Sequence, residues 1–211
     1  MMPSKKEMQM ALEKRHGKAL QEKFSKTTVA VCGLGGLGSN IAISLARAGI
    51  GRLILIDFDK VDITNLHRQQ YKAYQVGMKK TSAMLRNLVE IAPYIQVADF
   101  YEKVCEDNAA RLLRDADIIC EAFDDAQAKA MLTNIVLEKM PEKYLVAASG
   151  MSGLGSPNAI RTRKITKRFY LCGDEVSDVK DGIGLMAPRV MLCAAHQAQT
   201  VLRIIAGEMD I

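Results

Sequence analysis

Four glycines in a six-residue segment of this chain could hold a phosphate group. The segment at positions 33–38 reads GLGGLG, and it separates the apolar run TTVAVC from an Ala/Leu-rich run. Its glycines are Gly33, Gly35, Gly36 and Gly38. The first, second and fourth form G-x-G-x-x-G, which permits a tight turn, close approach of the backbone to a phosphate and close helix–strand packing. A helix that begins at Ser39 and Asn40 would present free N–H groups to an anion. The segment predicts a nucleotide-binding turn, and the alternative is a glycine turn that serves packing alone.

Polar residues follow a second apolar run, RLILI, where a strand is expected to end. Asp57 lies 19 residues after Gly38, near the spacing at which an acid bonds a ribose hydroxyl. The polar residues beyond it are Asp59, Asn65, Arg68 and Gln69. An Arg side chain offers a planar fork to phosphate oxygens, and Asn and Gln add neutral hydrogen bonds. The glycine turn alone is compatible with a dinucleotide or with ATP, and this cluster favours ATP.

Two further positions extend the same pattern of charge. Lys80 ends the segment GMKK at an expected helix start and could reach a triphosphate, whereas a solvated helix face is the alternative for Lys79 and Lys80. Asp124 and Asp125 follow the segment DIICEAF, which predicts a strand. Two acids beside a triphosphate suit Mg²⁺, which takes one or two carboxylates plus phosphate oxygens. The alternative is an N-cap for the next helix, which suits Asp125 better than both acids together.

Apolar and amphipathic runs alternate along residues 27–150. The runs that predict buried strands are TTVAVCG, RLILIDFD, YIQVADFYEKV, DIICEAFDD and YLVAASG. The runs between them, such as SNIAISLARAG and MKKTSAMLRNLVEIA, predict helices. This alternation implies an α/β fold with a doubly wound, mostly parallel, Rossmann-like sheet. The polar residues above would then lie at one edge of the sheet, where ligands bind.

The chain has 211 residues, enough for one domain with a sizeable core, and no linker interrupts it. We therefore expect a single domain over residues 1–211. Its parts would be an N-terminal helix at 4–23 with a candidate break at Gly17, a nucleotide-binding core at 27–150, and a C-terminal part with a crossover loop at 151–211. In the last part, AIRTRKI and RFYLCG predict short strands, and PRVMLCAAHQAQTVLRIIAG predicts a closing helix.

Composition narrows the class of protein. The chain is 49% hydrophobic and 25% charged with a net charge of +5, as in ordinary globular proteins. It has no dense Lys/Arg stripe, no Trp and few aromatics, which argues against a nucleic-acid surface. No apolar run reaches the length of a membrane span, and the N-terminus lacks the apolar core of a signal peptide. Its five cysteines are scattered, which suits reduced thiols. We expect a cytoplasmic protein with neither nucleic acid nor membrane as a partner.

The motifs above occur together with several others. They are GLGGLGS (33–39), DFD (57–59), NLHRQ (65–69), GMKK (77–80), the aspartate of FDD (123–125) and APRV (187–190). As a set they resemble the ThiF/MoeB/HesA superfamily of adenylyltransferases related to ubiquitin-activating enzymes, over residues 13–207. EKRHG (13–17), SNIA (39–42), EAFD (121–124) and AAHQA (194–198) are most similar to the short ThiF-type branch, the sulfur carrier protein ThiS adenylyltransferases.

The resemblance implies an ATP-dependent adenylyltransferase that uses ATP and Mg²⁺. Such enzymes adenylate the C-terminal Gly-Gly carboxylate of a small ubiquitin-like sulfur carrier protein, here a ThiS-like carrier of thiamine thiazole biosynthesis, and release pyrophosphate. The nucleophile is the carrier's carboxylate, so the enzyme needs no Ser-His pair or activated Cys. It has to align two anions and spread the developing charge over cations.

The resemblance also implies a role for each matched residue. The glycines at 33–38 would place backbone beside phosphate, and Asp57 would bond the ribose with Asp59 in support. The residues that would grip the triphosphate are Asn65, Arg68, Gln69 and Lys80, and the two cations among them would stabilise the charge of the leaving pyrophosphate. Asp124 would hold Mg²⁺. Arg15 matches an arginine that reaches into the partner subunit's site, which implies a homodimer with Arg15 acting in trans.

The chain departs from many relatives at its cysteines. Those relatives carry two CxxC pairs that bind zinc, whereas this chain has no such pair, so no structural zinc is expected. Some relatives use a loop cysteine to take the carrier or its sulfur. Cys172, in FYLCGD, is the candidate for that role, and a buried strand cysteine is the alternative.

Other functions remain open at the level of sequence. The same chemistry could act on a molybdopterin-pathway carrier, a peptide or a tRNA-base carboxylate. The chain could also be a non-catalytic partner subunit, but such subunits lose triphosphate-binding residues, and Arg68, Lys80 and Asp124 are all present here. A nicotinamide oxidoreductase would usually need a further domain, and 61 residues follow Gly150.

Overall fold

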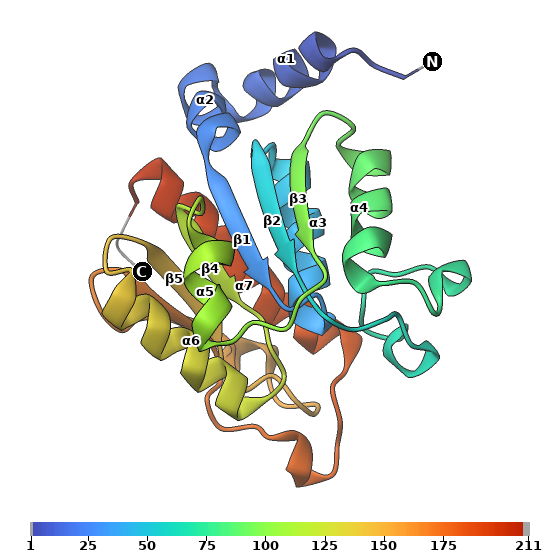
Figure 1. Cartoon of the computed structure of the whole chain (residues 1–211), viewed down its shortest axis with the longest axis vertical. Helices are drawn as coiled ribbons and strands as arrows, with labels where there is room; N and C mark the ends of the chain where they lie inside the picture. Colours follow the sequence, from blue (N-terminus) through green and yellow to red (C-terminus); the bar gives the residue numbers. More distant parts are fainter. Residues whose placement is uncertain (1, 209–211) are drawn as a thin grey trace.

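The described part of the chain forms one seven-stranded sheet (Figure 1). The computed structural model describes residues 2–208, and of residue 181 only the backbone. The strands are β1 (Thr28–Cys32), β2 (Arg52–Ile56), β3 (Gln96–Phe100), β4 (Ile118–Glu121), β5 (Tyr144–Ala148), β6 (Arg161–Lys164) and β7 (Phe169–Gly173). Their order is β3-β2-β1-β4-β5-β7-β6. Neighbouring strands are parallel except for β6 and β7, so the expected mostly parallel sheet is confirmed.

Helices cover both faces of this sheet. The α-helices are α1 (Lys5–His16), α2 (Lys18–Lys26), α3 (Gly36–Ala48), α4 (Lys80–Ile91), α5 (Glu106–Leu113), α6 (Ala126–Lys139) and α7 (Ala187–Ala206), and short 3-10 turns are η1 (Ile63–Asn65), η2 (Ala73–Gln75), η3 (Pro157–Ala159) and η4 (Val179–Asp181). Helices α3, α4 and α7 contribute to the core on one face, and α5 and α6 to the core on the other. The fold is therefore doubly wound, as predicted.

Strand β1 lies at the centre of both cores. Val29 and Val31 belong to one core, and Ala30 and Cys32 belong to the other. A strand that is buried on both faces needs a continuous apolar run rather than an alternating one. This requirement explains why the last four residues of β1 and of β2 are all apolar and buried, and why the first charged residue after β2 is Asp57 at the sheet edge.

The strand order reverses beside β1, since the chain builds β2 and β3 on one side of it and β4 and β5 on the other. Ligands of open α/β sheets bind at such a switch point, beyond the carboxyl ends of the strands. The glycine turn follows β1 there, and the segment 121–125 follows β4. The two are in direct contact, because a Cβ added to Gly33 would lie 2.8 Å from the carbonyl oxygen of Ala122.

The structure corrects two predicted helix boundaries. Helix α3 begins at Gly36 and not at Ser39, whose N–H is already bonded to the Gly35 carbonyl. The free N–H groups of this helix therefore belong to the glycine turn itself rather than to Ser39 and Asn40. The predicted helix at 4–23 is two helices, α1 and α2, which meet at Gly17 with φ +83° and so confirm the candidate break there.

Helix α1 lies at the amino edge of the sheet, opposite the glycine turn (Figure 1). It has no buried residue, and it is joined to the body through α2, whose Gln21 donates to the Gly49 carbonyl just before β2. The Tyr94 hydroxyl, just before β3, donates to the Pro3 carbonyl. Both contacts are made at the start of strands, so α1 lies away from the carboxyl edge.

Helix α7 is the last helix of the described residues, and it packs against α3. With 20 residues it buries Val190, Cys193, Ala194 and Gln197 among others. The side-chain amide of Gln197 donates to the carbonyls of Glu121 and Val146, which ties α7 to β4 and β5. Within residues 2–208, no helix combines the length and the apolar composition that crossing a membrane would require.

Gly38→Ala tests the close packing of the glycine turn. A Cβ at Gly38 would lie 1.8 Å from the Gly33 carbonyl oxygen, which is backbone and has no room to move. We expect a loss of about 3 kcal/mol or more in the free energy of unfolding by urea. Gly184→Ala is the control, since a Cβ there meets no atom within 4 Å. Equal stability of the two variants would contradict this account of the turn.

Candidate functional site

Asp57 joins the end of β2 to the glycine turn. Its Oδ2 accepts a hydrogen bond from the Leu34 N–H at 2.6 Å, and its Oδ1 accepts one from the Asp59 N–H at 2.7 Å. The Tyr71 hydroxyl donates to the Leu34 carbonyl at 2.8 Å, so both backbone polar groups of Leu34 are held. Burial raises the pKa of Asp57, and the ammonium of Lys80 and these N–H groups oppose that rise. Each carboxylate oxygen keeps a further acceptor position, so the ribose contact stays a prediction.

Lys80 begins α4 as predicted, but its ammonium lies among acids. Nζ is 2.7 Å from Asp59 Oδ2 and 4.0 Å from Asp57 Oδ2, and the residue is 5% exposed. The alternative of a solvated helix face is therefore wrong for Lys80. It holds for Lys79, which is exposed and lies over the Tyr101 ring at 4.4 Å from the centroid. Asp59, for which the family resemblance implies a supporting role, is the nearest acidic partner of Lys80.

Asn65, Arg68 and Gln69 form one hydrogen-bonded group against the glycine turn. Asn65 Oδ1 accepts from Arg68 Nη2 at 3.1 Å and from Gln69 Nε2 at 3.0 Å. A Cβ at Gly36 would lie 3.5 Å from Arg68 Cγ, and one at Gly35 would lie 3.9 Å from Gln69 Nε2. The structure thus brings this predicted cluster and the predicted turn together.

Two polar atoms of this group are orphaned. Arg68 Nε and Gln69 Oε1 are buried and have no hydrogen-bond partner among the described residues. Buried polar atoms in folded proteins are nearly always paired. A donor and an acceptor left open beside a glycine turn fit a polar ligand such as ATP.

Asp124 and Asp125 have different surroundings. Asp125 Oδ1 accepts from the Ala128 N–H at 2.8 Å and so caps α6, which confirms the N-cap alternative for this residue. The Asp124 side chain is exposed, and within residues 2–208 its carboxylate makes no hydrogen bond or ion pair. A free carboxylate beside the glycine turn fits Mg²⁺, which is usually held by one or two carboxylates together with phosphate oxygens. The described residues hold no cluster of three or more His, Cys, Asp or Glu side chains suited to a metal.

The glycine turn at 33–38 is closed on one side and leaves room for a ligand on the other. Its inner side is closed, since a Cβ at Gly33 or Gly38 would collide with backbone. Its other side is open at Gly35, where an added Cβ would meet only Gln69 Nε2 at 3.9 Å. Backbone that is free of side chains lets a phosphate approach the N–H groups closely, so the residues present fit ATP.

A hollow of about 280 Å³ lies beyond the carboxyl ends of β5 and β7. Arg189, from the APRV segment, lines it and pairs with Asp174. Its Nη1 also donates to the carbonyls of Gly155 and Ser156 at 2.6 and 2.8 Å. Arg189 therefore connects the loop after β5, the loop after β7 and the start of α7.

Asp174 is held as an anion in this arrangement. Burial by itself would raise the pKa of Asp174, but hydrogen bonds from the N–H groups of Ser177 and Val176, from the Ser177 hydroxyl and from Arg189 lower it to about 2. The carboxylate is thus a fixed negative charge throughout the neutral range. It anchors the segment that follows β7, which belongs to the C-terminal part at 151–211 that was expected to contain a crossover loop.

Arg15 is not brought to this site. It is an exposed residue of α1, and α1 lies at the amino edge. β1 spans five residues, so about 16 Å of strand separates that edge from the glycine turn. Arg15 therefore lies far from the other predicted site residues of its own chain.

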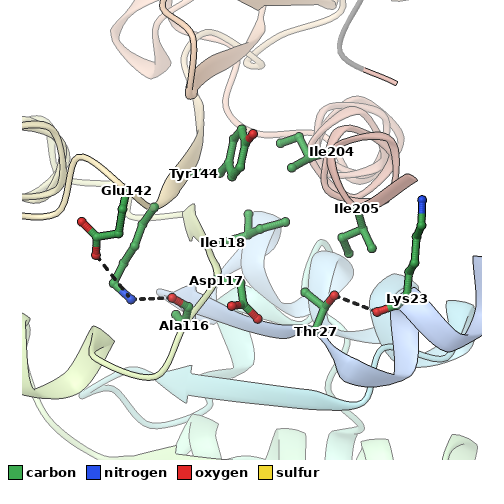
Figure 2. A pocket seen from close by; sticks show the side chains of 10 residues that line it. Lys23, Thr27, Ala116, Asp117, Ile118, Glu142, Tyr144, Ile204 and Ile205 are labelled. Atoms are coloured by element: carbon green, nitrogen blue, oxygen red, sulfur yellow. Dashed lines mark hydrogen bonds and ion pairs between the residues drawn. The ribbon is translucent and has the colours of Figure 1, made fainter. Parts of the chain in front are cut away.

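A larger hollow, of about 470 Å³, also lies at the amino edge. Figure 2 shows Ile118, Tyr144 and Ile204 around it, with Lys23 and Thr27 on one flank. These residues lie at the starts of strands or in α2 and α7, and no member of the glycine turn or the Asn65 cluster lines this hollow. It is separate from the candidate site.

Cys172 lies inside β7 and not in a mobile loop. It is fully buried, and burial raises the pKa of its thiol to about 11. Thiolate is the reactive form of cysteine, so this thiol is not prepared to act as a nucleophile. The alternative interpretation, a buried strand cysteine, is the one that the structure supports.

Five residues at or near the candidate site were not predicted from the sequence. They are Tyr71, Glu121, Lys129, Asp174 and Arg189. Two signals were available, because Glu121 belongs to the EAFD segment and Arg189 to the APRV segment. Tyr71 carries no local signal, since its partner Leu34 is distant in sequence. Lys129 carries none because its partner Glu121 lies on a different element, β4, and only the packing of α6 brings the two together.

The sequence of this chain is similar to those of known proteins of one family. The model of the ThiF family matches residues 7–211. Adenylyltransferase and sulfurtransferase MOCS3 of Aedes aegypti is 36% identical over 200 residues, which are 90% of this chain and 44% of that protein. Adenylyltransferase and sulfurtransferase UBA4 of Kluyveromyces lactis is 28% identical over 207 residues, 94% of this chain and 46% of that protein. This chain thus spans less than half the length of these curated relatives.

Solved structures show the same fold. The crystal structure of E. coli tRNA N6-threonylcarbamoyladenosine dehydratase, TcdA, in complex with ATP superposes with a TM-score of 0.86 at 22% identity, and the match covers 99% of this chain and 98% of that one. E. coli MccB gives a TM-score of 0.70 at 23% identity over 90% of this chain and 59% of that one. These matches confirm the expected Rossmann-like α/β fold.

Asp174→Asn should destabilise the protein near neutral pH and lose this effect in acid. The carboxylate has a folded pKa of about 2 and an ordinary value of 3.8. Its contribution is therefore fully present above about pH 4 and is lost as the pH falls toward 2. We expect about 2 kcal/mol less stability in urea unfolding at about pH 7 and a shrinking difference at about pH 2.5. Asp99→Asn, at an exposed strand position, is the control. A difference that stays constant with pH would refute the proposed anchor.

Proposed function

This chain belongs to the ThiF family, and on that premise we propose that it is an ATP-dependent adenylyltransferase. It would transfer AMP from ATP to a carboxylate, which forms an acyl-adenylate and releases pyrophosphate. The observation that carries the proposal is the orphaned pair Arg68 Nε and Gln69 Oε1 against the glycine turn. The names of the curated relatives, which pair adenylyltransferase with sulfurtransferase, support the same chemistry.

The proposed nucleotide lies across the carboxyl edge in the order of the strands. The ribose would lie near Asp57 after β2, and the phosphates would lie over the glycine turn after β1. The α-phosphate, which is bonded to the ribose, would come first on this path, and the β- and γ-phosphates would extend toward Asp124 after β4. The strand order β2-β1-β4 supports this path, because it places the three segments side by side at one edge.

Directed contacts rather than net charge would bind the triphosphate. With both acids ionised, the charges of Asp57, Asp59, Lys80 and Arg68 cancel. Attraction would therefore come from N–H groups of the turn, from the guanidinium of Arg68 and from the ammonium of Lys80, which Asp59 holds in place. Mg²⁺ held by Asp124 would supply neutralisation of phosphate charge.

The chain would position the two reactants, and the nucleophile would come from the acceptor. An oxygen of the acceptor carboxylate attacks the α-phosphorus, the bond to the bridging oxygen breaks, and pyrophosphate leaves with the electron pair. Arg68 and Lys80 would stabilise the charge that develops on the leaving group. Alignment of two reactants at one edge of a rigid sheet accounts for a large part of such rate enhancements.

The acceptor that we propose is the C-terminal Gly-Gly carboxylate of a small ubiquitin-like sulfur carrier protein of the ThiS kind. The names of MOCS3 and UBA4 support a link to sulfur transfer. A specific role in thiamine biosynthesis stays a prediction, as does a molybdopterin-pathway carrier. Either carrier would present the same terminal carboxylate to the site.

A tRNA-base carboxylate is the second candidate acceptor. The match to TcdA covers nearly the whole of both chains, unlike the match to the longer curated relatives. Basic residues on β6 and the turn after it could contact phosphates. They are Arg161, Arg163, Lys164 and Lys167. This candidate would overturn the expectation that nucleic acid is not a partner.

ATP–pyrophosphate exchange in the presence of Mg²⁺ tests the proposed function and identifies the acceptor. We expect exchange with a ThiS-like carrier and none with the same carrier lacking its terminal glycine, because the reacting carboxylate is then displaced. Exchange with a tRNA that bears a carboxylate on a base, and none with the carrier, would favour the second candidate. No exchange with any acceptor, although ATP raises the melting temperature, would refute both.

A mixed-dimer experiment tests the proposed homodimer and the role of Arg15 in trans. We expect Arg15→Ala and Asp124→Ala each to lower activity at least about 100-fold, because each removes charge stabilisation at the phosphates. Random exchange between the two variants should restore about a quarter of the wild-type rate, since half of the dimers contain one intact site. Lys14→Ala, on the same helix, is the control. Mixed dimers that form but stay inactive would exclude a role of Arg15 in trans.

A further inference from the structure

An ion pair between a buried acid and a partly buried lysine flanks Asp124 and has no role in the proposal above. Glu121 is the last residue of β4, and it is 1% exposed. Lys129 of α6 places its Nζ 2.9 Å from Glu121 Oε2 and 3.1 Å from Oε1. The same Nζ donates to the Ala148 carbonyl at the end of β5, at 2.9 Å. The pair therefore connects β4, β5 and α6 directly behind the predicted metal carboxylate.

The ion pair fixes the backbone that carries Asp124. Glu121 Oε1 accepts a hydrogen bond from the Phe123 N–H at 2.7 Å. On the other side, Asp125 caps α6. Asp124 thus lies between Phe123, whose N–H is held by the Glu121 carboxylate, and Asp125, whose own carboxylate holds the Ala128 N–H. The carboxylate of Asp124 stays free.

The same segment forms the floor of the glycine turn. A Cβ at Gly33 would lie 2.8 Å from the Ala122 carbonyl oxygen and 3.1 Å from the Phe123 ring. Gln197 of α7 holds the neighbouring carbonyl, that of Glu121, at 2.9 Å. A shift of this segment would therefore change the distance between the phosphate-binding turn and the Asp124 carboxylate.

Stability alone does not explain such a pair. Buried ion pairs contribute little net stability compared with apolar residues of similar volume, because desolvation of the two charges offsets their attraction. Two similar arrangements occur at the same edge, Asp57 with Lys80 and Asp174 with Arg189. In each, the acid follows or ends a strand and accepts the N–H of the residue two positions later. This shared geometry at one edge of the sheet indicates that the three ion pairs fix the positions of the loops there.

We propose that Glu121 and Lys129 are positioning residues for the metal site. Together they hold the segment 121–125 so that the Asp124 carboxylate faces Mg²⁺ on the triphosphate. This inference rests on the proposed function, since it assumes that Asp124 binds Mg²⁺. Neither residue touches the reacting atoms.

Lys129→Met tests the inference through metal affinity rather than turnover. The probe is Mn²⁺, titrated into protein in excess over a non-hydrolysable ATP analogue, with free Mn²⁺ followed by electron paramagnetic resonance. We expect the dissociation constant for Mn²⁺ to rise at least about 10-fold, as for other residues that orient metal ligands. Binding of the analogue without metal should stay unchanged, because the glycine turn is intact. Lys129→Arg should retain most of the metal affinity, since the positive charge is kept.

Two further variants distinguish failure of the positioning role from failure of the proposed metal site. Lys139→Met removes an exposed lysine from the same helix and should leave Mn²⁺ affinity at the wild-type level. Asp124→Asn should abolish tight Mn²⁺ binding. If Asp124→Asn does so and Lys129→Met does not, the positioning role is wrong and the proposed function stands. If Asp124→Asn keeps full Mn²⁺ affinity, the proposed metal site itself is wrong.

Glu121→Gln keeps the inference falsifiable if Lys129→Met does not fold. The substitution keeps the shape and removes the charge, so Lys129 loses its ionic partner. We expect the same rise in the Mn²⁺ dissociation constant, with a far-ultraviolet circular dichroism spectrum like that of the wild type. A folded Glu121→Gln variant with wild-type Mn²⁺ affinity would overturn the inference.

Discussion

The close packing of backbone on backbone at the centre of the sheet is the constraint on which the candidate site depends. The turn after β1 and the segment after β4 touch without an intervening side chain, as the Cβ test at Gly33 shows. Gly38 is equally constrained, because the start of α3 folds back onto the Gly33 carbonyl. Only glycine permits this approach. The approach in turn places Asp124 next to a turn with free N–H groups, which makes one site out of two strand ends.

Ion pairs at the carboxyl edge then set the position of each loop. Three acids, Asp57, Glu121 and Asp174, each pair with a cation near the start of the following helix. Because the pairs are largely buried, the charges are expensive to separate, and the loops gain one defined position rather than much net stability. Asp124 takes no part in these pairs, and its exposed carboxylate is the proposed ligand of the metal ion.

The carboxyl edge and the amino edge of the sheet carry different features. Beyond the carboxyl edge lie the glycine turn, the Asn65 cluster and the Arg189 hollow, whereas α1 and the larger hollow lie at the amino edge. The length of β1 separates an arginine on α1 from the candidate site of its own chain. If Arg15 takes part in the reaction, it does so in a second copy, which agrees with the homodimer that the family resemblance implies.

Local patterns in the sequence determined the strands, most helices, the glycine turn and the cluster from Asn65 to Gln69, because these depend on residues that are near neighbours in the chain. The same patterns placed the start of α3 three residues late, since glycines are poor helix formers and the tertiary contact at Gly38 outweighs that preference. Partners far apart in the chain were decided by the fold alone. Asp59 meets Lys80, Lys129 reaches the Ala148 carbonyl, and Cys172 is buried, because strand order and helix packing set these distances and no local periodicity encodes them.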